Sequence, residues 1–406
     1  EKIDFLTTSA SPTLFQSNLY ASFLSVDIES LVHSSTPNLN HFMANITSKL
    51  LIRNDSGEYV EALAPIIVSA SRSTDIPAFY VDWFFERLKR GYSVWINPFN
   101  GVRSYISYDK TRFIVFWSKN PRPLLKHLNY LDERNISSYI QYTLNDYEEE
   151  RLEKGVPPLS QRVETFKLLV DRLGKGRVIW RFDPMILTDK INMDKLLAKV
   201  KRIGNQLKGY TEKLVFSYAD IATYVKVKAN LEKNCINYIE WDTDLMIEFA
   251  SRLSEMNRVL GWNFKLATCG EKVDLGQYGI EHNRCVDDDL IIRFAYKDKV
   301  LMDYLKVEIN TITTKQPSLF DDFEEPNQIP DNAIMLTPDL YAVKRKNNKD
   351  NGQRQLCGCI VSKDIGQYNT CPHLCEYCYA NTSKETATLN WERHNLNHKS
   401  ETVTGQ

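Results

Sequence analysis

The chain has 406 residues, 51 Lys and Arg against 52 Asp and Glu, and a formal net charge of −1. This balance excludes the overall basic excess of a dedicated nucleic-acid or anionic-membrane binder, although a local basic patch remains open. Hydrophobic residues make up 43% and charged residues 25% of the chain, a globular composition that excludes disorder as the main state. A chain of this length holds two or three domains, or one large barrel with appendages.

No apolar run approaches the ~20 residues that span a bilayer. The first residues, 1–5, have neither the basic nor the apolar region of an export signal. We therefore expect a cytoplasmic protein that does not enter a membrane. Because a core of this size needs no metal or disulfide to hold it together, we expect any metal site to serve chemistry.

Short β-branched runs alternate with helical patterns between Pro65 and Gly270. This alternation is typical of βα units around a parallel sheet. The predicted strands are 66–71, 113–118, 139–144, 178–182, 214–218 and 264–268. The predicted helices are 79–90, 124–134, 161–172, 194–207 and 245–260. We predict an α/β fold in which six parallel strands form an open (β/α)6-type barrel.

The sequence predicts four regions around this barrel. Residues 1–64 are rich in Ser, Thr and Asn and are expected to be an N-terminal extension, and residues 65–306 to be the barrel. Residues 307–350 are expected to be an inserted mobile loop, because its centre has few apolar residues and many acids and prolines. Residues 351–406 are expected to form a C-terminal cysteine segment.

Polar side chains follow each predicted strand. In α/β barrels the ligand lies at the carboxyl ends of the strands, because the βα loops converge there. We therefore predict one shared site that contains Asp75, Lys119, Thr143, Arg181 and Ser217. Arg181 either grips a ligand carboxylate with two parallel hydrogen bonds or forms an ion pair with Asp183 or Asp220.

Five of the eight cysteines lie between positions 357 and 378. Clustered thiols in a long chain without an export signal indicate metal binding rather than disulfides. Cys371, Cys375 and Cys378 can hold three irons of a four-iron cubane and leave the fourth iron open. A zinc site with His373 as the fourth ligand and a set of buried thiols are the alternatives.

The motif Cys371-Pro-His-Leu-Cys375-Glu-Tyr377-Cys378 resembles the CxxxCx-aromatic-C signature of the radical S-adenosylmethionine (SAM) superfamily. This resemblance implies a [4Fe–4S] cluster whose open iron chelates SAM, with Tyr377 near the adenine and Arg181 as a carboxylate clamp. It implies reductive cleavage of SAM to a 5′-deoxyadenosyl radical that abstracts a hydrogen from the substrate. A low-potential electron donor of the flavodoxin or ferredoxin type is the implied partner.

The order of the other motifs resembles the spore-photoproduct-lyase-like branch of that superfamily. Segments 74–77, 118–121 and 158–164 match motifs that follow the cysteine loop in that branch, whereas here they precede it. We therefore expect a circularly permuted relative, most similar from about residue 66 to 381 to the domain-of-unknown-function family 1848. The branch hints at a nucleic-acid substrate, which two basic segments would favour: Arg87, Lys89 and Arg90, and then Lys344, Arg345, Lys346, Lys349 and Arg354.

Four further cysteines provide the ligands that a closed metal site needs: Cys269, Cys285, Cys357 and Cys359. We predict a second, auxiliary [4Fe–4S] cluster near the SAM site. A structural zinc ion is the main competitor, and the absence of a second metal is the third alternative. Cys235 is expected to be a plain thiol.

We expect a radical SAM enzyme with an unknown, possibly nucleic-acid-linked, substrate. The alternative is a non-catalytic iron–sulfur or zinc protein that acts as an adaptor or redox sensor. Gln316-Pro-Ser-Leu-Phe320 resembles the short peptide with which bacterial DNA-processing proteins bind the sliding clamp. The clamp is therefore a further expected partner.

Overall fold

The computed structural model describes residues 48–98, 100–312 and 329–406. An eight-stranded sheet, in which every neighbouring pair of strands is parallel, forms its centre. The order across this sheet is β13 (Ile280–His282), β12 (Lys265–Thr268), β10 (Lys213–Tyr218), β8 (Val178–Met185), β7 (Ser137–Thr143), β6 (Phe113–Ser118), β3 (Ile67–Ala70) and β17 (Lys363–Asp364). The prediction of an α/β fold with a parallel sheet is confirmed.

The six predicted strands correspond to β3, β6, β7, β8, β10 and β12, and consecutive strands of this series are neighbours in the sheet. Their side chains are buried on both faces, as in β6, where five of six positions are buried. Parallel sheets are covered on both faces, and the carboxyl ends of parallel strands all lie at the same edge of the sheet. The six carboxyl ends therefore point toward a common region.

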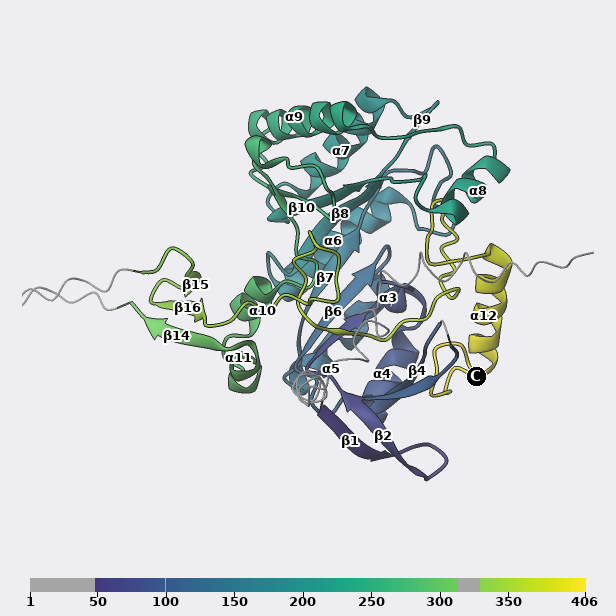
Figure 1. The fold of residues 1–406 in the computed structure, drawn as a ribbon, viewed down its shortest axis with the longest axis vertical. Coiled ribbons are helices and arrows are strands. Elements are labelled where there is room, and N and C mark those ends of the chain that lie inside the picture. Colours follow the sequence, from purple (N-terminus) through teal and green to yellow (C-terminus); the bar gives the residue numbers. More distant parts are fainter. Residues whose placement is uncertain (1–47, 99, 313–328) are drawn as a thin grey trace, which may run out of the picture.

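Five helices follow the strands close to their predicted positions. They are α4 (Val81–Arg90), α5 (Leu128–Glu133), α6 (Leu159–Leu173), α7 (Met193–Leu207) and α9 (Thr243–Val259), and α7 and α9 lie side by side (Figure 1). The predicted helix 79–90 is divided into α3 (Ile76–Phe79) and α4. Tyr80 interrupts it, with φ −120° and ψ 15°, and donates a 2.5 Å hydrogen bond to the carbonyl of Thr370.

Shorter elements join these units. They are η2 (Arg122–His127), β9 (Leu187–Thr188), α8 (Val225–Lys233), β11 (Tyr238–Ile239), η3 (Gly276–Tyr278), α10 (Asp288–Ala295), α11 (Lys299–Leu305) and α12 (Lys384–Leu396). Within the described part of the chain, no helix is both long and apolar enough to cross a membrane.

Two small sheets flank the central one. The first has the order β1 (Ser48–Arg53), β2 (Tyr59–Ala64), β5 (Arg103–Ser107) and β4 (Tyr92–Ile96). The end of the predicted N-terminal extension is therefore part of the folded body, because β2 pairs with β5. Residues 1–47 lie outside the described residues.

The second small sheet has the order β14 (Val307–Thr311), β16 (Leu340–Lys344) and β15 (Ile334–Thr337). It occupies both described ends of the region predicted as an inserted loop, so these ends are strands rather than loop. The predicted clamp-binding peptide, 316–320, lies outside the described residues.

The C-terminal segment returns to the central sheet. It runs from β16 across the strands to α12 on the other side of the molecule (Figure 1). On this path β17 pairs with β3 at the edge of the sheet. Asp364 fixes it there, because its carboxylate accepts from Ser69 Oγ at 2.8 Å, Ser71 Oγ at 2.7 Å and the N–H of Arg72 at 2.9 Å. The cysteine loop 371–378 therefore follows a strand of the sheet.

Candidate metal and ligand site

A cavity of about 420 Å³ lies at the carboxyl ends of the parallel strands. Its volume is within the range of small-molecule and cofactor pockets. All thirteen predicted site residues line it: Asp75, Lys119, Thr143, Arg181, Ser217, Tyr377 and the seven cysteines Cys269, Cys285, Cys357, Cys359, Cys371, Cys375 and Cys378. Cys235 is exposed and does not line it.

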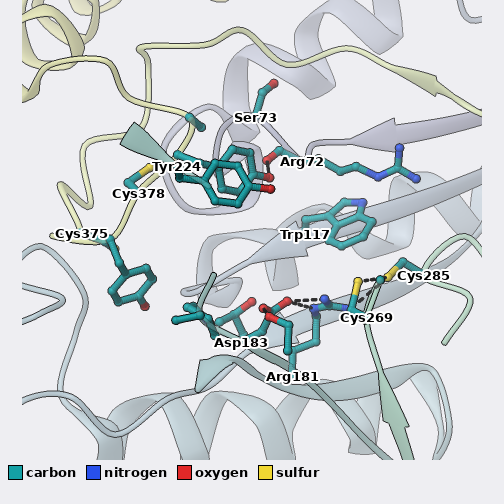
Figure 2. Close-up of a pocket in the computed structure, with 18 of the residues that line it drawn as sticks. Arg72, Ser73, Trp117, Arg181, Asp183, Tyr224, Cys269, Cys285, Cys375 and Cys378 are labelled. Atoms are coloured by element: carbon teal, nitrogen blue, oxygen red, sulfur yellow. Dashed lines mark hydrogen bonds and ion pairs between the residues drawn. The ribbon is translucent and has the colours of Figure 1, made fainter. Parts of the chain in front are cut away.

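Two groups of cysteines face this cavity. Cys375 and Cys378 lie on one side of it, and Cys269 and Cys285 on the other (Figure 2). The two groups come from different parts of the fold, the first from the loop after β17 and the second from the ends of β12 and β13. The cavity therefore has room for a ligand between two thiol groups.

Buried thiols and converging N–H groups define the loop site. Burial raises the pKa of Cys371, Cys375 and Cys378. Backbone N–H groups donate toward two of these sulfurs: those of His373 and Asp75 toward Cys371, and those of Ala380 and Asn381 toward Cys378. Donors of this kind stabilise negative charge on sulfur, and a metal takes the place of the proton when it binds a thiolate.

His373 lies inside the cysteine loop but turns away from the thiols. Its Nε2 is 2.8 Å from Asp75 Oδ2, and its Nδ1 is 2.9 Å from the carbonyl oxygen of Gly155. Both ring nitrogens are therefore engaged by oxygen acceptors. This arrangement disfavours His373 as the fourth ligand of a zinc ion in the loop.

Asp75 joins the ends of β3 and β6 to the cysteine loop. Besides His373, its carboxylate accepts from Ser118 Oγ at 2.6 Å, the N–H of Lys119 at 2.7 Å and the N–H of Ala78 at 3.0 Å. Burial raises the pKa of this carboxyl, but the bond to His373 and the other donors lower it by more. Asp75 therefore positions the loop rather than offering a free carboxylate to the cavity.

The Tyr377 hydroxyl is held in a buried polar network. It donates to Glu153 and lies 3.0 Å from both Lys119 Nζ and Asn145 Nδ2. Lys119 Nζ also donates to Glu153 Oε1 at 2.7 Å. Lys119 is thus neutralised by a carboxylate that the sequence did not single out, and Tyr377 is fixed at its hydroxyl end with the ring lining the cavity.

Arg181 forms an ion pair with Asp183, which is the second of the two interpretations from the sequence. Asp183 also accepts a hydrogen bond from Ser217 Oγ. The guanidinium reaches Cys285 Sγ at 3.2 Å and Gln141 Oε1 at 3.3 Å. Arg181 is therefore directed at the second group of cysteines.

The second group of cysteines forms a connected row. Cys269 Sγ and Cys285 Sγ are 3.3 Å apart, Cys359 Sγ accepts from the N–H of Cys285 at 3.2 Å, and Cys357 contacts Cys359. Among the described residues, no three cysteine sulfurs lie within 4.8 Å of one another. The four thiols thus line the same region of the cavity, although their sulfur atoms do not all lie close to a single point.

Several cavity residues were not singled out as ligands from the sequence. Trp117 lies between Arg72 and Arg181 (Figure 2), whose guanidinium carbons are 5.4 and 5.3 Å from its ring centroid. Glu271 accepts from the N–H of Tyr218 at 2.9 Å, and burial raises its pKa to about 7. In the sequence, the feature that could have identified each of these residues as part of the site was its position at the end of a predicted strand.

Three residues of the two basic segments are engaged in ion pairs. Arg87 is fully buried and pairs with Asp55, Lys344 pairs with Asp288 and Asp289, and Arg345 pairs with Glu308. The charge of these three residues is therefore balanced within the chain.

The model of the family described as "Domain of unknown function (DUF1848)" matches residues 67–380. The chain belongs to the DUF1848 family. The matched part of this DUF1848 protein contains the whole central sheet and all thirteen predicted site residues. Among curated proteins and among solved structures, no significant match to the chain is found.

Proposed function

We propose that this DUF1848 protein is a radical SAM enzyme whose open-iron [4Fe–4S] cluster is held by Cys371, Cys375 and Cys378. The observation that carries the proposal is a set of three loop thiols beside a ligand-sized cavity, with His373 engaged elsewhere by both ring nitrogens. Three protein ligands leave one iron free to bind a small molecule. The N–H groups directed at the sulfurs suit an anionic cluster.

The position of the loop supports a circular permutation. The resemblance implies a cysteine loop that follows a strand of the parallel sheet. In this chain the loop follows β17, which lies at the edge of the sheet beside β3. In the chain, β17 comes last of the eight strands of the sheet. In space, it lies beside β3, which comes first.

When bound, the cluster would supply the electron that cleaves SAM to methionine and a 5′-deoxyadenosyl radical. The chain's own residues would hold the cofactor still and exclude water. Tyr377, whose hydroxyl is held by hydrogen bonds, would present its ring to the cofactor. Thr143 and Ser217 line the cavity with polar groups. Asp75 holds the cysteine loop against the ends of β3 and β6. The substrate would enter the remaining space, and a flavodoxin- or ferredoxin-type protein would deliver the electron.

Iron analysis and SAM binding test this proposal. Anaerobically purified protein is expected to bind SAM at equilibrium, and the Cys371→Ala/Cys375→Ala/Cys378→Ala variant is expected to lose about four irons and the SAM binding together. Cys235→Ala is the matched control, because that thiol is exposed and does not line the cavity. Equal SAM binding by the triple variant would overturn the proposal and favour an adaptor or sensor role.

A further inference from the structure

The four cysteines across the cavity have a distinctive electrostatic setting. Three guanidinium groups surround Cys269, Cys285, Cys357 and Cys359. Arg181 donates to Cys285 Sγ at 3.2 Å. Arg72 lines the same cavity as the four cysteines, and its guanidinium carbon lies 5.4 Å from the ring centroid of Trp117, against which Arg181 also packs at 5.3 Å.

The third guanidinium belongs to Arg354, on the approach to Cys357. Its Nη1 lies 3.2 Å from the position that a Cβ atom would take at Gly270, next to Cys269. Gly270 has a φ of +77° and no side chain, so it allows this close approach. Its other terminal nitrogen donates to Tyr224 Oη at 2.9 Å.

Neutral donors add to this positive field. The N–H groups of Cys285 and Val286 point at Cys359 Sγ at 3.2 and 3.4 Å, and Asn283 Nδ2 donates to Cys285 Sγ at 3.2 Å. Of the carboxylates near the row, Asp183 is paired with Arg181 and Asp364 accepts four hydrogen bonds from β3 and its own turn. Arg181, Asn283 and two backbone N–H groups therefore direct hydrogen-bond donors at the sulfurs of Cys285 and Cys359.

We propose that Cys269, Cys285, Cys357 and Cys359 hold a second, redox-active [4Fe–4S] cluster, and that Arg72, Arg181 and Arg354 stabilise its more negative, reduced form. Four thiolates around a metal group carry a net negative charge, and an iron–sulfur cluster gains one more on reduction whereas zinc does not change. Nearby guanidinium groups therefore stabilise the reduced state of a cluster relative to its oxidised state, whereas a zinc ion has no second redox state for them to favour.

The four thiols lie close enough together to share one metal group. Cys269 Sγ and Cys285 Sγ are 3.3 Å apart, while no three cysteine sulfurs among the described residues lie within 4.8 Å of one another. Zinc and a four-iron cubane both take four thiolates, so metal analysis distinguishes them.

Metal content is the first test and does not depend on SAM chemistry. Wild-type protein purified anaerobically is expected to hold about eight irons, and the triple loop variant about four with the Mössbauer signature of a cubane. The double variant Cys357→Ala/Cys359→Ala is expected to retain the loop cluster alone. One zinc per chain in the triple variant, or no metal in a triple variant whose circular dichroism is native, would overturn the proposal. Iron in the triple variant that binds no SAM supports the second cluster even if the radical function fails.

Redox titration by electron paramagnetic resonance tests the guanidinium cage. In the triple loop variant, Arg72→Met is expected to move the midpoint potential of the remaining cluster to more negative values, whereas Arg72→Lys retains most of the wild-type value. Lys297→Met, at the opposite end of the sheet, is the control and leaves the potential unchanged. An Arg72→Met potential equal to that of the wild type would overturn the role of the arginines.

Discussion

His373 Nε2 lies 2.8 Å from Asp75 Oδ2, although the two residues are 298 positions apart in the chain. This contact joins the C-terminal cysteine loop to the end of β3. It is buried, with exposed fractions of 1% for His373 and 6% for Asp75. The loop's position over the sheet therefore depends on a pairing between the two ends of the described fold.

Replacing Asp75 by Asn is expected to loosen the cysteine loop. The amide would turn one of its donors toward His373, Ser118 or the N–H of Lys119, so a buried donor would lose its acceptor at a cost of about 1–3 kcal/mol. We expect a lower urea midpoint and a lower iron content. Asp82→Asn, whose carboxylate is exposed, is the control. Unchanged stability and iron content in Asp75→Asn would contradict the positioning role.

Replacing Glu153 by Gln tests the network around Tyr377. Burial raises the pKa of Glu153, but Lys119 and Arg162 lower it by more, to about 2 from an ordinary value of 4.5. A folded-state pKa below the unfolded value stabilises the fold above pH 4.5, and this stabilisation is lost as the pH falls from 4.5 toward 2. This lowering of the pKa corresponds to about 3 kcal/mol of folding free energy at pH values above 4.5.

The measurement is the free energy of unfolding as a function of pH. Glu153→Gln is expected to be less stable at pH 7 and to show a shallower loss of stability between pH 4.5 and 2 than the wild type. Glu61→Gln, with an exposed side chain, is expected to follow the wild-type curve. A Glu153→Gln curve parallel to that of the wild type would exclude this pKa assignment.

Gly155 allows the segment before α6 to approach the cysteine loop closely. A Cβ atom there would lie 2.7 Å from the carbonyl oxygen of His373 and 2.8 Å from that of Pro372. Because these neighbours are backbone atoms, we expect Gly155→Ala to destabilise the protein by about 1–3 kcal/mol and to reduce iron retention. Gly352→Ala, whose nearest neighbour is the Asp350 side chain, should have a much smaller effect in the same denaturation assay. Equal effects would contradict the steric argument.

Removal of all metal is expected to leave the central sheet folded. The large core consists mainly of side chains from the sheet and its helices, with Cys375 among its buried members and Cys378 packed against it, and a core of this size does not need a metal to hold it together. Far-ultraviolet circular dichroism of the chelated protein should match that of the loaded protein, with protease sensitivity increased only in segments 351–383. Loss of the sheet signal on chelation would show that the metals are structural.

The central strands could be predicted because most of their positions are buried on both faces, so β6 and the first three residues of β8 are apolar runs. Strand β17 could not, because Lys363–Asp364 is two polar residues held by side-chain bonds to β3. The convergence of the thirteen site residues followed from strand ends and cysteine spacing. The roles of Asp75, Lys119 and Arg181 did not, since their partners His373, Glu153 and Cys285 are distant in sequence.

The central claim is that Cys371, Cys375 and Cys378 support reductive cleavage of SAM. Anaerobically reconstituted protein should be mixed with SAM and dithionite and the products separated by liquid chromatography. The account predicts 5′-deoxyadenosine from the wild type and from Cys235→Ala, and none above the no-protein blank from the triple loop variant. A wild-type protein with a full complement of iron that forms no 5′-deoxyadenosine, or a triple variant that forms as much as the wild type, would contradict it.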